Sequence, residues 1–247
     1  TPSVSSAASD VYKRQVEELV DGLDSFVYNT TTDGNLAVKA TEGGSIGDLY
    51  GRVATGETDA AGLPLFSGGP TELLGNAQPD FLAGWSNTIA YKDFTMSFLI
   101  DARIGGQIYS QTSSLLDQRG VSERSLQYRD GVVVSGTNTG TGAANTERIS
   151  GQEYWTQMSE VSGNYVYDQD NIRLRELSIG YNIPNVSAIG LSSANIQLVG
   201  RNLFFLSKSA EDIDPEAMLG TSIGVQGMSQ NAMPTLRSLG LNLTLNF

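Results

Sequence analysis

The chain of 247 residues contains neither cysteine nor histidine. Without cysteine this sequence offers no disulfide, zinc–thiolate site, iron–sulfur cluster or cysteine nucleophile. Without histidine it also lacks the usual general base, the usual orienting member of a catalytic triad and the commonest transition-metal ligand. Most hydrolase and metalloenzyme mechanisms therefore lose their best candidate residues, although chemistry that uses carboxylates alone is not excluded.

Positive charge and long apolar runs are also scarce. The chain has 15 Lys and Arg against 27 Asp and Glu, a formal net charge of -12 that opposes binding to nucleic acid, so we expect no nucleic-acid partner. No run approaches the roughly 18 to 20 apolar residues of a membrane-spanning helix. A β-barrel stays compatible with a composition that is 39% hydrophobic, because barrel strands alternate apolar and polar residues.

The amino-terminal residues lack the charged, apolar and small-residue succession of a signal peptide. Residues 1–15, TPSVSSAASDVYKRQ, share no pattern with the rest and are interpreted as a non-native or disordered leader. We therefore expect the chain to be a fragment of a longer protein, with its fold carried by residues 16–247.

A strict alternation of apolar and polar residues marks several segments. It is clearest over residues 238–247 and recurs at 94–104 and 176–183, and 195–206 is expected to return antiparallel to the last of these. Trp85, Ile89 and Tyr91 share a face before Lys92-Asp93, which predicts a hairpin turn. A period of two predicts strands with one apolar and one polar face.

The strands and their connections together predict the fold class. The strands have about the 9 to 11 residues that cross a bilayer at a tilt, more than is usual in soluble sheets. Short turns alternate with long polar segments at 115–163 and 208–234, which include a Gly-rich stretch after Gly136 that we expect to be a mobile loop. We predict an all-β, antiparallel transmembrane β-barrel with short turns on one rim and long loops on the other.

Seven segments also carry a family resemblance through their order and spacing. They are GGSIGDLYG from Gly43, GLPLF from Gly62, the stretch from Gly75 to Tyr109, NIRLRELSIGYNIP from Asn171, GRNLFFLSK from Gly200, DIDPE from Asp212 and LGLNLTLNF from Leu239. As a set they resemble the C-terminal region of SusC-like and RagA-like TonB-linked outer-membrane transporters. These transporters import large nutrients such as oligosaccharides or peptides.

The resemblance implies a partial barrel from a plugged transporter of about 22 strands. The family's plug and its TonB-contacting segment have no counterpart in this sequence, so TonB would act on the parent protein through that region. The other implied partners are outer-membrane lipid, a SusD-like surface lipoprotein and an oligosaccharide or peptide substrate. The implied location is the outer membrane of a Gram-negative cell, and we expect no enzyme activity, cofactor or bound metal.

Three groups of residues are candidates for specific roles. The last strand looks like the signal by which barrels are recognised for assembly, or it is an ordinary edge strand: Leu239, Leu241, Leu243, Leu245 and Phe247. Four charged residues are expected to face the lumen, in salt bridges, plug contacts or substrate contacts: Asp101, Arg103, Arg173 and Arg175, with Asp101 and Arg103 a possible pair. Four aromatic residues lie in or beside a long loop and either stack on sugar rings or serve as girdle and packing residues: Tyr154, Trp155, Tyr165 and Tyr167.

The carboxylates of Asp212, Asp214 and Glu216 raise the alternative of a calcium site, because hard cations need several oxygen ligands at close spacing. The full calcium-loop pattern is missing, and Pro215 together with the resemblance favours the start of a structured loop. Two other functions stay open beside the transporter: a soluble β-sandwich that binds glycans, and a secreted glycoside hydrolase that uses two carboxylates.

Overall fold

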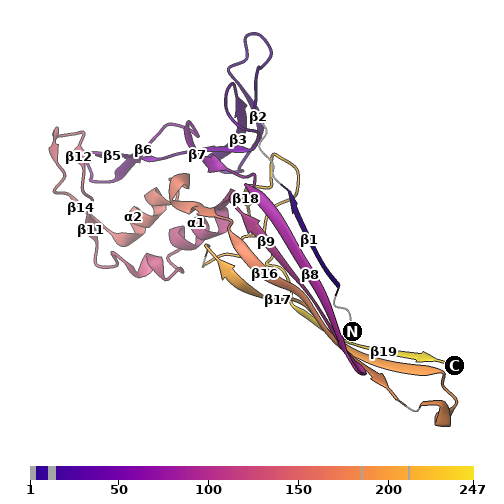
Figure 1. Cartoon of the computed structure of the whole chain (residues 1–247). Helices are drawn as coiled ribbons and strands as arrows, with labels where there is room; N and C mark the ends of the chain where they lie inside the picture. Colours follow the sequence, from indigo (N-terminus) through magenta and orange to yellow (C-terminus); the bar gives the residue numbers. More distant parts are fainter. Residues whose placement is uncertain (1–3, 11–14, 185, 211) are drawn as a thin grey trace.

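The computed structural model describes residues 4–10, 15–184, 186–210 and 212–247. These residues form a long, twisted sheet and, at one end of it, a set of shorter strands and helices (Figure 1). Within the described residues, no helix has both the length and the apolar composition needed to cross a membrane. The regular structure of the described residues is mostly β-strand, as the sequence predicts.

The long sheet contains six antiparallel strands. In spatial order they are β1 (Val4–Asp10), β8 (Phe81–Tyr91), β9 (Phe94–Ile104), β16 (Asn171–Ile183), β17 (Ser193–Lys208) and β19 (Ser238–Asn246). The predicted strands and the Lys92-Asp93 turn are confirmed. β1 comes from the segment interpreted as a leader, of which residues 1–3 and 11–14 lie outside the described residues; that interpretation stays a prediction.

One face of this sheet is apolar and exposed. A single row crosses five neighbouring strands in register: Ile89, Met96, Ile179, Leu198 and Leu241. Each of these side chains is between 36% and 66% exposed. The next row toward the β8–β9 turn includes Tyr91 and Phe94, which are also exposed. Alternation within each strand places its apolar side chains on this one side of the sheet. Nothing in the described part of the chain covers them.

The opposite face carries polar side chains that bond across the strands. The hydroxyls of Ser97 and Ser178 lie 2.6 Å apart, and Asn195 Nδ2 donates to Asn182 Oδ1 at 2.7 Å. Such cross-strand pairs stabilise a sheet and satisfy polar groups that the neighbouring strands partly bury. The two faces therefore differ in chemistry as well as in exposure.

A β-bulge keeps the faces distinct along β16. Apolar residues occupy even positions up to Leu174 and odd positions from Leu177, so the pattern changes phase within one strand. In the pairing with β9, Leu174 and Glu176 face the consecutive residues Ile100 and Leu99, which makes Arg175 the extra residue. The pairing with β17 is also irregular at this point, where Leu174 faces Phe204 and Glu176 faces Arg201. A bulge adds one residue on one strand only, so the apolar side chains return to the same face after it.

Short and long connections emerge from opposite ends of the sheet (Figure 1). β8 and β9 are joined by two residues, and β16 and β17 by a short connection that includes the 3-10 helix η3 (Val186–Ile189). The longer segments, residues 15–80, 105–170 and 209–237, gather at the other end. We call the described parts of these three segments the loop unit.

The loop unit is largely regular structure. Its first segment supplies β2 (Ser25–Thr30), β3 (Leu36–Thr41), β4 (Asp48–Gly51), β5 (Ala54–Thr58), β6 (Pro64–Phe66) and β7 (Glu72–Asn76). The second supplies β10 (Gln107–Ser110), α1 (Gln111–Gln118), η1 (Arg124–Leu126), β11 (Val132–Val133), β12 (Thr137–Asn138), β13 (Ala143–Ala144), β14 (Arg148–Ile149), α2 (Gly151–Met158), η2 (Ser162–Tyr165) and β15 (Val166–Asp168). The third supplies β18 (Met228–Ser229). These strands form four small sheets, β2-β3-β4-β7, β13-β12-β5-β6, β15-β10-β18 and β11-β14.

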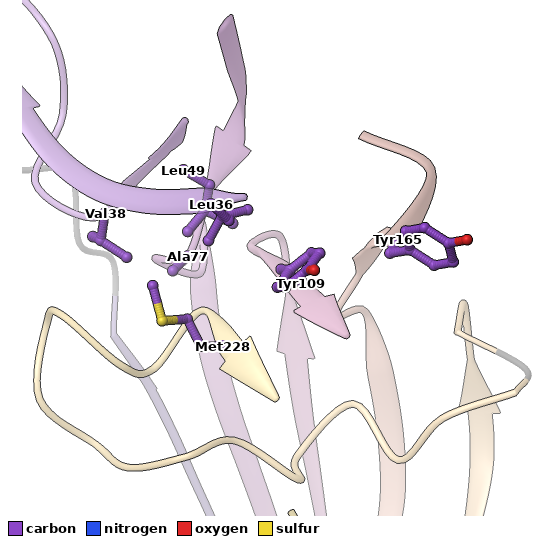
Figure 2. Packing of buried hydrophobic residues seen from close by; sticks show 7 residues of the cluster. All are labelled: Leu36, Val38, Leu49, Ala77, Tyr109, Tyr165 and Met228. Carbon is purple, nitrogen blue, oxygen red and sulfur yellow. The ribbon is translucent and has the colours of Figure 1, made fainter. Parts of the chain in front are cut away.

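All three segments share one hydrophobic core (Figure 2). Its members are Leu36, Val38, Leu49 and Ala77 from the first segment, Tyr109 and Tyr165 from the second and Met228 from the third, all fully buried. Segments that leave the sheet between different strands are thus packed together by burial of apolar surface. The long polar connections form one folded unit and are not independent loops.

The Gly-rich stretch after Gly136, which we expected to be a mobile loop, contains two short strands. Residues 137–138 and 143–144 pair as a hairpin, and β12 also pairs with β5, about 80 residues earlier in the chain. Asn138 is buried, and its Oδ1 accepts from the backbone N–H of Gly140 at 2.9 Å. The composition indicates turns correctly, but it carries no information about a partner so distant in sequence.

A capping box begins α2, and its loss should loosen the start of that helix. Ser150 Oγ accepts from the backbone N–H of Glu153 at 3.2 Å, and Glu153 Oε2 accepts from the backbone N–H of Ser150 at 2.8 Å. We expect Ser150→Ala to cost about 1 kcal/mol and to speed hydrogen exchange in the first turn of α2. Glu153→Gln, which can still accept the backbone bond, should have a smaller effect; equal exchange in Ser150→Ala and the parent protein would contradict the prediction.

Candidate functional site

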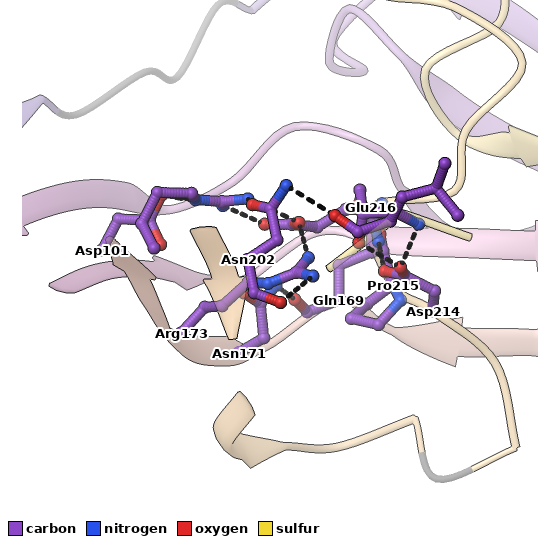
Figure 3. A network of polar contacts seen from close by, with 11 residues as sticks. Asp101, Gln169, Asn171, Arg173, Asn202, Asp214, Pro215 and Glu216 are labelled. Atoms are coloured by element: carbon purple, nitrogen blue, oxygen red, sulfur yellow. Dashed lines mark hydrogen bonds and ion pairs between the residues drawn. The ribbon is translucent and has the colours of Figure 1, made fainter. Parts of the chain in front are cut away.

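An ion-pair network joins the third segment of the loop unit to the polar face of the sheet (Figure 3). The carboxylate of Glu216 accepts from Arg173 Nη1 at 2.5 Å and from Arg175 Nη2 at 2.5 Å. Arg175 also donates to Asp101 Oδ2 of β9 at 2.8 Å. The bulge at Arg175 brings this guanidinium between the two carboxylates. Three of the four charged residues that we expected in the lumen thus meet in one network, although their facing a lumen stays a prediction.

Burial makes this network more than a surface contact. The side chain of Arg173 is only 4% exposed, and that of Glu216 is 18% exposed. The Arg173 guanidinium also lies over the ring of Phe205, 4.4 Å from its centroid. Charged groups removed from water need partners, and here each is held by an opposite charge and by hydrogen bonds.

Arg103 does not pair with Asp101, so that expectation is wrong. Its Nη2 donates to the carbonyl oxygen of Ala77 and to Gln169 Oε1, both at 2.7 Å. Asp101 binds Arg175 on the adjacent strand. The register explains this, because Asp101 is paired with Arg173 across β9 and β16, and the bulged residue Arg175 beside that pair reaches the same carboxylate.

The DIDPE segment from Asp212 begins a closed loop, as expected from Pro215 and the family resemblance. Asp214 Oδ1 accepts from the backbone N–H of Glu216 at 3.0 Å, while Oδ2 accepts from the N–H and hydroxyl of Thr235 at 2.9 and 2.6 Å. One carboxylate thereby joins the beginning and end of the third segment. Among the described residues, no cluster of three or more Asp and Glu side chains is placed to hold a metal ion.

The hydrogen bonds of Asp214 make the third segment sensitive to acid. Burial opposes ionisation of this carboxyl, but the bonds from Thr235 and from the N–H of Glu216, together with nearby Arg173, lower its pKa below the ordinary value. A depressed pKa stabilises the folded form above the unfolded pKa of about 4, and this contribution is lost as pH falls through the folded value.

We therefore expect residues 215–229 to exchange amide hydrogens faster as the pH falls below about 4, after correction for the intrinsic pH dependence of exchange. Asp214→Asn should already show the faster exchange at pH 6, and its difference from the parent protein should shrink toward pH 3. A difference that does not change with pH would contradict a role for ionised Asp214.

The four loop aromatics pack mainly within the loop unit. Tyr165 is fully buried, and its hydroxyl donates to Asp117 Oδ2 at 3.0 Å. Burial, followed by the adjacent carboxylate, raises the pKa of this phenol above its ordinary value, so it stays protonated as a donor. Trp155 is 7% exposed and its Nε1 donates to the carbonyl of Gln127 at 3.2 Å. Tyr154 and Tyr167 are half-buried. Tyr165 has no face open to a sugar ring.

The terminal strand lies at one edge of the described sheet. β19 pairs with β17 along its whole length, and all its residues are exposed. Leu243 is paired with Ile196 on the apolar face, and Phe247 follows the strand. This position suits either an assembly signal or an ordinary edge strand, and the first of these stays a prediction.

Sequence reasoning missed three features, two in this network and one in the loop unit. Glu216 was considered only as a cation ligand, whereas it is the centre of the ion-pair network. The bulge at Arg175 was also missed, although the change of phase between Leu174 and Leu177 could have revealed it. The buried carboxylate of Asp117, held by Arg124, Ser122 and Tyr165, had no local signal.

Comparison with known proteins gives the sequence relatives of the chain. It is 26% identical over 271 residues to TonB-dependent receptor P3 of Formosa agariphila, a match that covers 95% of this chain and 26% of that receptor. It is 25% identical over 199 residues to TonB-dependent receptor P26 of the same organism, covering 76% of this chain and 19% of that receptor. The chain resembles TonB-dependent receptors. It spans about a quarter or less of the length of these curated receptors, and no family model matches it.

Solved structures with this fold agree with the resemblance to TonB-dependent receptors. The RagAB peptide importer in its open-open state has a TM-score of 0.63 and 16% identity, over 99% of this chain and 26% of the solved chain. A structure of the RagAB peptide transporter gives a TM-score of 0.58 and 14% identity, over 99% and 27% of the two chains. The predicted resemblance to SusC-like and RagA-like receptors is thereby confirmed, while barrel closure and the number of strands stay predictions.

Proposed function

We propose that this chain forms part of the barrel wall and of the external surface of a TonB-dependent outer-membrane transporter. The observation that carries the proposal is the exposed apolar row that runs through Ile89, Met96, Ile179, Leu198 and Leu241. A barrel in a bilayer needs such an outward apolar face, with polar residues on the other side. A soluble β-sandwich would bury the same face against a second sheet.

Aromatic side chains at the ends of the strands also support a sheet that spans the membrane. Tyr91 and Phe94 are exposed beside the shortest turn, and the rings of Phe94 and Tyr181 lie 4.6 Å apart. Aromatic side chains of this kind flank the apolar band of outer-membrane barrels at the interface with water. The short turns would then lie on the periplasmic side and the loop unit outside the cell.

The parent protein would import a bulky nutrient, an oligosaccharide or a peptide, by conformational gating. A SusD-like surface lipoprotein would cap it from outside, and TonB would act through the plug, as the resemblance to SusC-like receptors implies. The shared core of the loop unit supports this role, because a packed unit presents a defined surface to a partner. No described feature favours a glycoside hydrolase, since Asp101 and Glu216 are both held by arginines.

The complete gene provides the test. Its product, expressed with its natural leader in a Gram-negative host, should fractionate with the outer membrane and migrate differently on a gel before and after heating. An encoded SusD-like lipoprotein should co-purify with it. A product that is soluble without detergent and migrates identically in both samples would overturn the proposal and favour the glycan-binding sandwich.

A further inference from the structure

A cavity of about 600 Å³ opens between the end of α1 and the beginning of α2 in the loop unit. Arg119 and Arg129 line it, together with Gln118, Gln152 and Trp155. We call it the arginine pocket. It lies apart from the Glu216 network and is formed entirely by the second segment of the loop unit.

The charges of the arginine pocket are unbalanced. Neither Arg119 nor Arg129 has an ion pair or a side-chain hydrogen bond within the described residues, and both are exposed. Asp117 is the one carboxylate that lines the pocket, and its oxygens are already taken by Arg124, Ser122 and Tyr165. In a chain with a net charge of -12, two arginines that have no ion pair within the described residues thus line one concave site.

The backbone beside the pocket is strained at Tyr128, the residue before Arg129. Tyr128 has a φ of +63°, which is uncommon for a bulky residue. Two contacts hold this backbone: the indole Nε1–H of Trp155 donates to the carbonyl of Gln127, and Gly151 packs so closely that a Cβ there would come within 2.4 Å of the Tyr128 carbonyl oxygen. Strain maintained by surrounding contacts is typical of binding sites.

We propose that the arginine pocket binds a carboxylate side chain of an acidic peptide. The planar fork of a guanidinium matches the two oxygens of a carboxylate, and two such groups would suit neighbouring acidic residues. The amides of Gln118 and Gln152 supply donors and acceptors for a peptide backbone. The pocket is less suited to a sugar, because Trp155 is nearly buried and offers no open ring face for stacking. This inference rests on the proposed function and names a substrate class for it.

The test uses the complete receptor purified in detergent. The probes are acetyl-Ala-Glu-Glu-Ala-amide and its neutral counterpart acetyl-Ala-Gln-Gln-Ala-amide, compared by calorimetry at low and moderate salt. We expect the acidic peptide to bind more tightly. Arg119→Gln and Arg129→Gln should each weaken its binding about tenfold or more, with little change for the neutral peptide.

Arg237→Gln is the matched control, because it removes one exposed arginine that is outside the arginine pocket. It should leave both affinities within about twofold. Equal binding of the two peptides, or equal losses in all three variants, would overturn the proposal. A receptor that is correctly inserted and heat-modifiable but binds neither peptide would overturn this inference alone, whereas a soluble product would overturn the transporter itself.

Discussion

Replacing Glu216 with alanine in the complete receptor should free residues 209–237 from the sheet at a cost of about 3 to 5 kcal/mol. The reason is the charge that remains. Arg173 and Arg175 both bind Glu216, and the side chain of Arg173 is nearly inaccessible to water. Without Glu216, Asp101 still binds Arg175, but Arg173 loses its only ion pair in the described part of the chain.

Glu176 provides the matched control. It also pairs with an arginine, Arg201, at 2.9 Å, but the two side chains are 39% and 66% exposed. Exposed ion pairs contribute less than about 1 kcal/mol, so Glu176→Ala should have a small effect. Hydrogen exchange over residues 215–229 and the temperature at which the folded gel band disappears would measure both variants. Similar results for the two would show that Glu216 does not hold the segment.

A third variant separates loss of charge balance from loss of contact. Replacing Glu216 with leucine and Arg173 with methionine removes both charges of the buried pair while keeping similar volumes, and Arg175 keeps its ion pair with Asp101. Because well-packed apolar residues often replace a buried ion pair without loss, this variant should recover most of the stability. Recovery would assign the cost in Glu216→Ala to uncompensated arginine charge. If the double variant is as unstable as Glu216→Ala, the specific hydrogen bonds are what hold the loop.

The long strands could be predicted from the sequence because their information is local. From Leu239 to Asn246, apolar and polar residues alternate, so the immediate neighbours of each residue indicate the face on which its side chain lies. Alternation alone therefore predicts the strand and its apolar face. The same reasoning located the turn at Lys92-Asp93. It failed at Arg175, where one additional residue changes the phase and the pairing register has to be known.

The loop unit could not be predicted because its information is distant. One core brings together Leu36, Tyr109 and Met228. None of them lies in a segment whose helical or strand periodicity is strong enough to predict that core. Composition rich in Gly, Ser and Asn correctly indicated turns at many positions. It could not show that three connections pack on one another, since this depends on where the sheet places their ends. The partners of Asp101 and Glu216 were missed for the same reason.

Leu243→Arg in the complete receptor should reduce outer-membrane insertion strongly, whereas Asn242→Arg should insert almost normally. The two residues are adjacent on β19 and exposed, but alternation places them on opposite faces. Leu243 pairs with Ile196 on the apolar face, and an arginine on the lipid face costs about 2 to 4 kcal/mol at mid-membrane and less toward the interfaces. Asn242 lies on the polar face, where a charged side chain can remain in water.

The amount of folded, heat-modifiable receptor in the outer membrane measures this prediction. Ile179→Arg should behave like Leu243→Arg because it lies on the same face of the central strand β16. Ser178 would be an unsuitable control, although it lies on the polar face, because it is buried against the hydroxyl of Ser97. Reduced insertion of Asn242→Arg with normal insertion of Leu243→Arg would reverse the assignment of the faces. Equal insertion of both would mean that neither face meets lipid, and the exposed apolar rows would then have to be covered by protein.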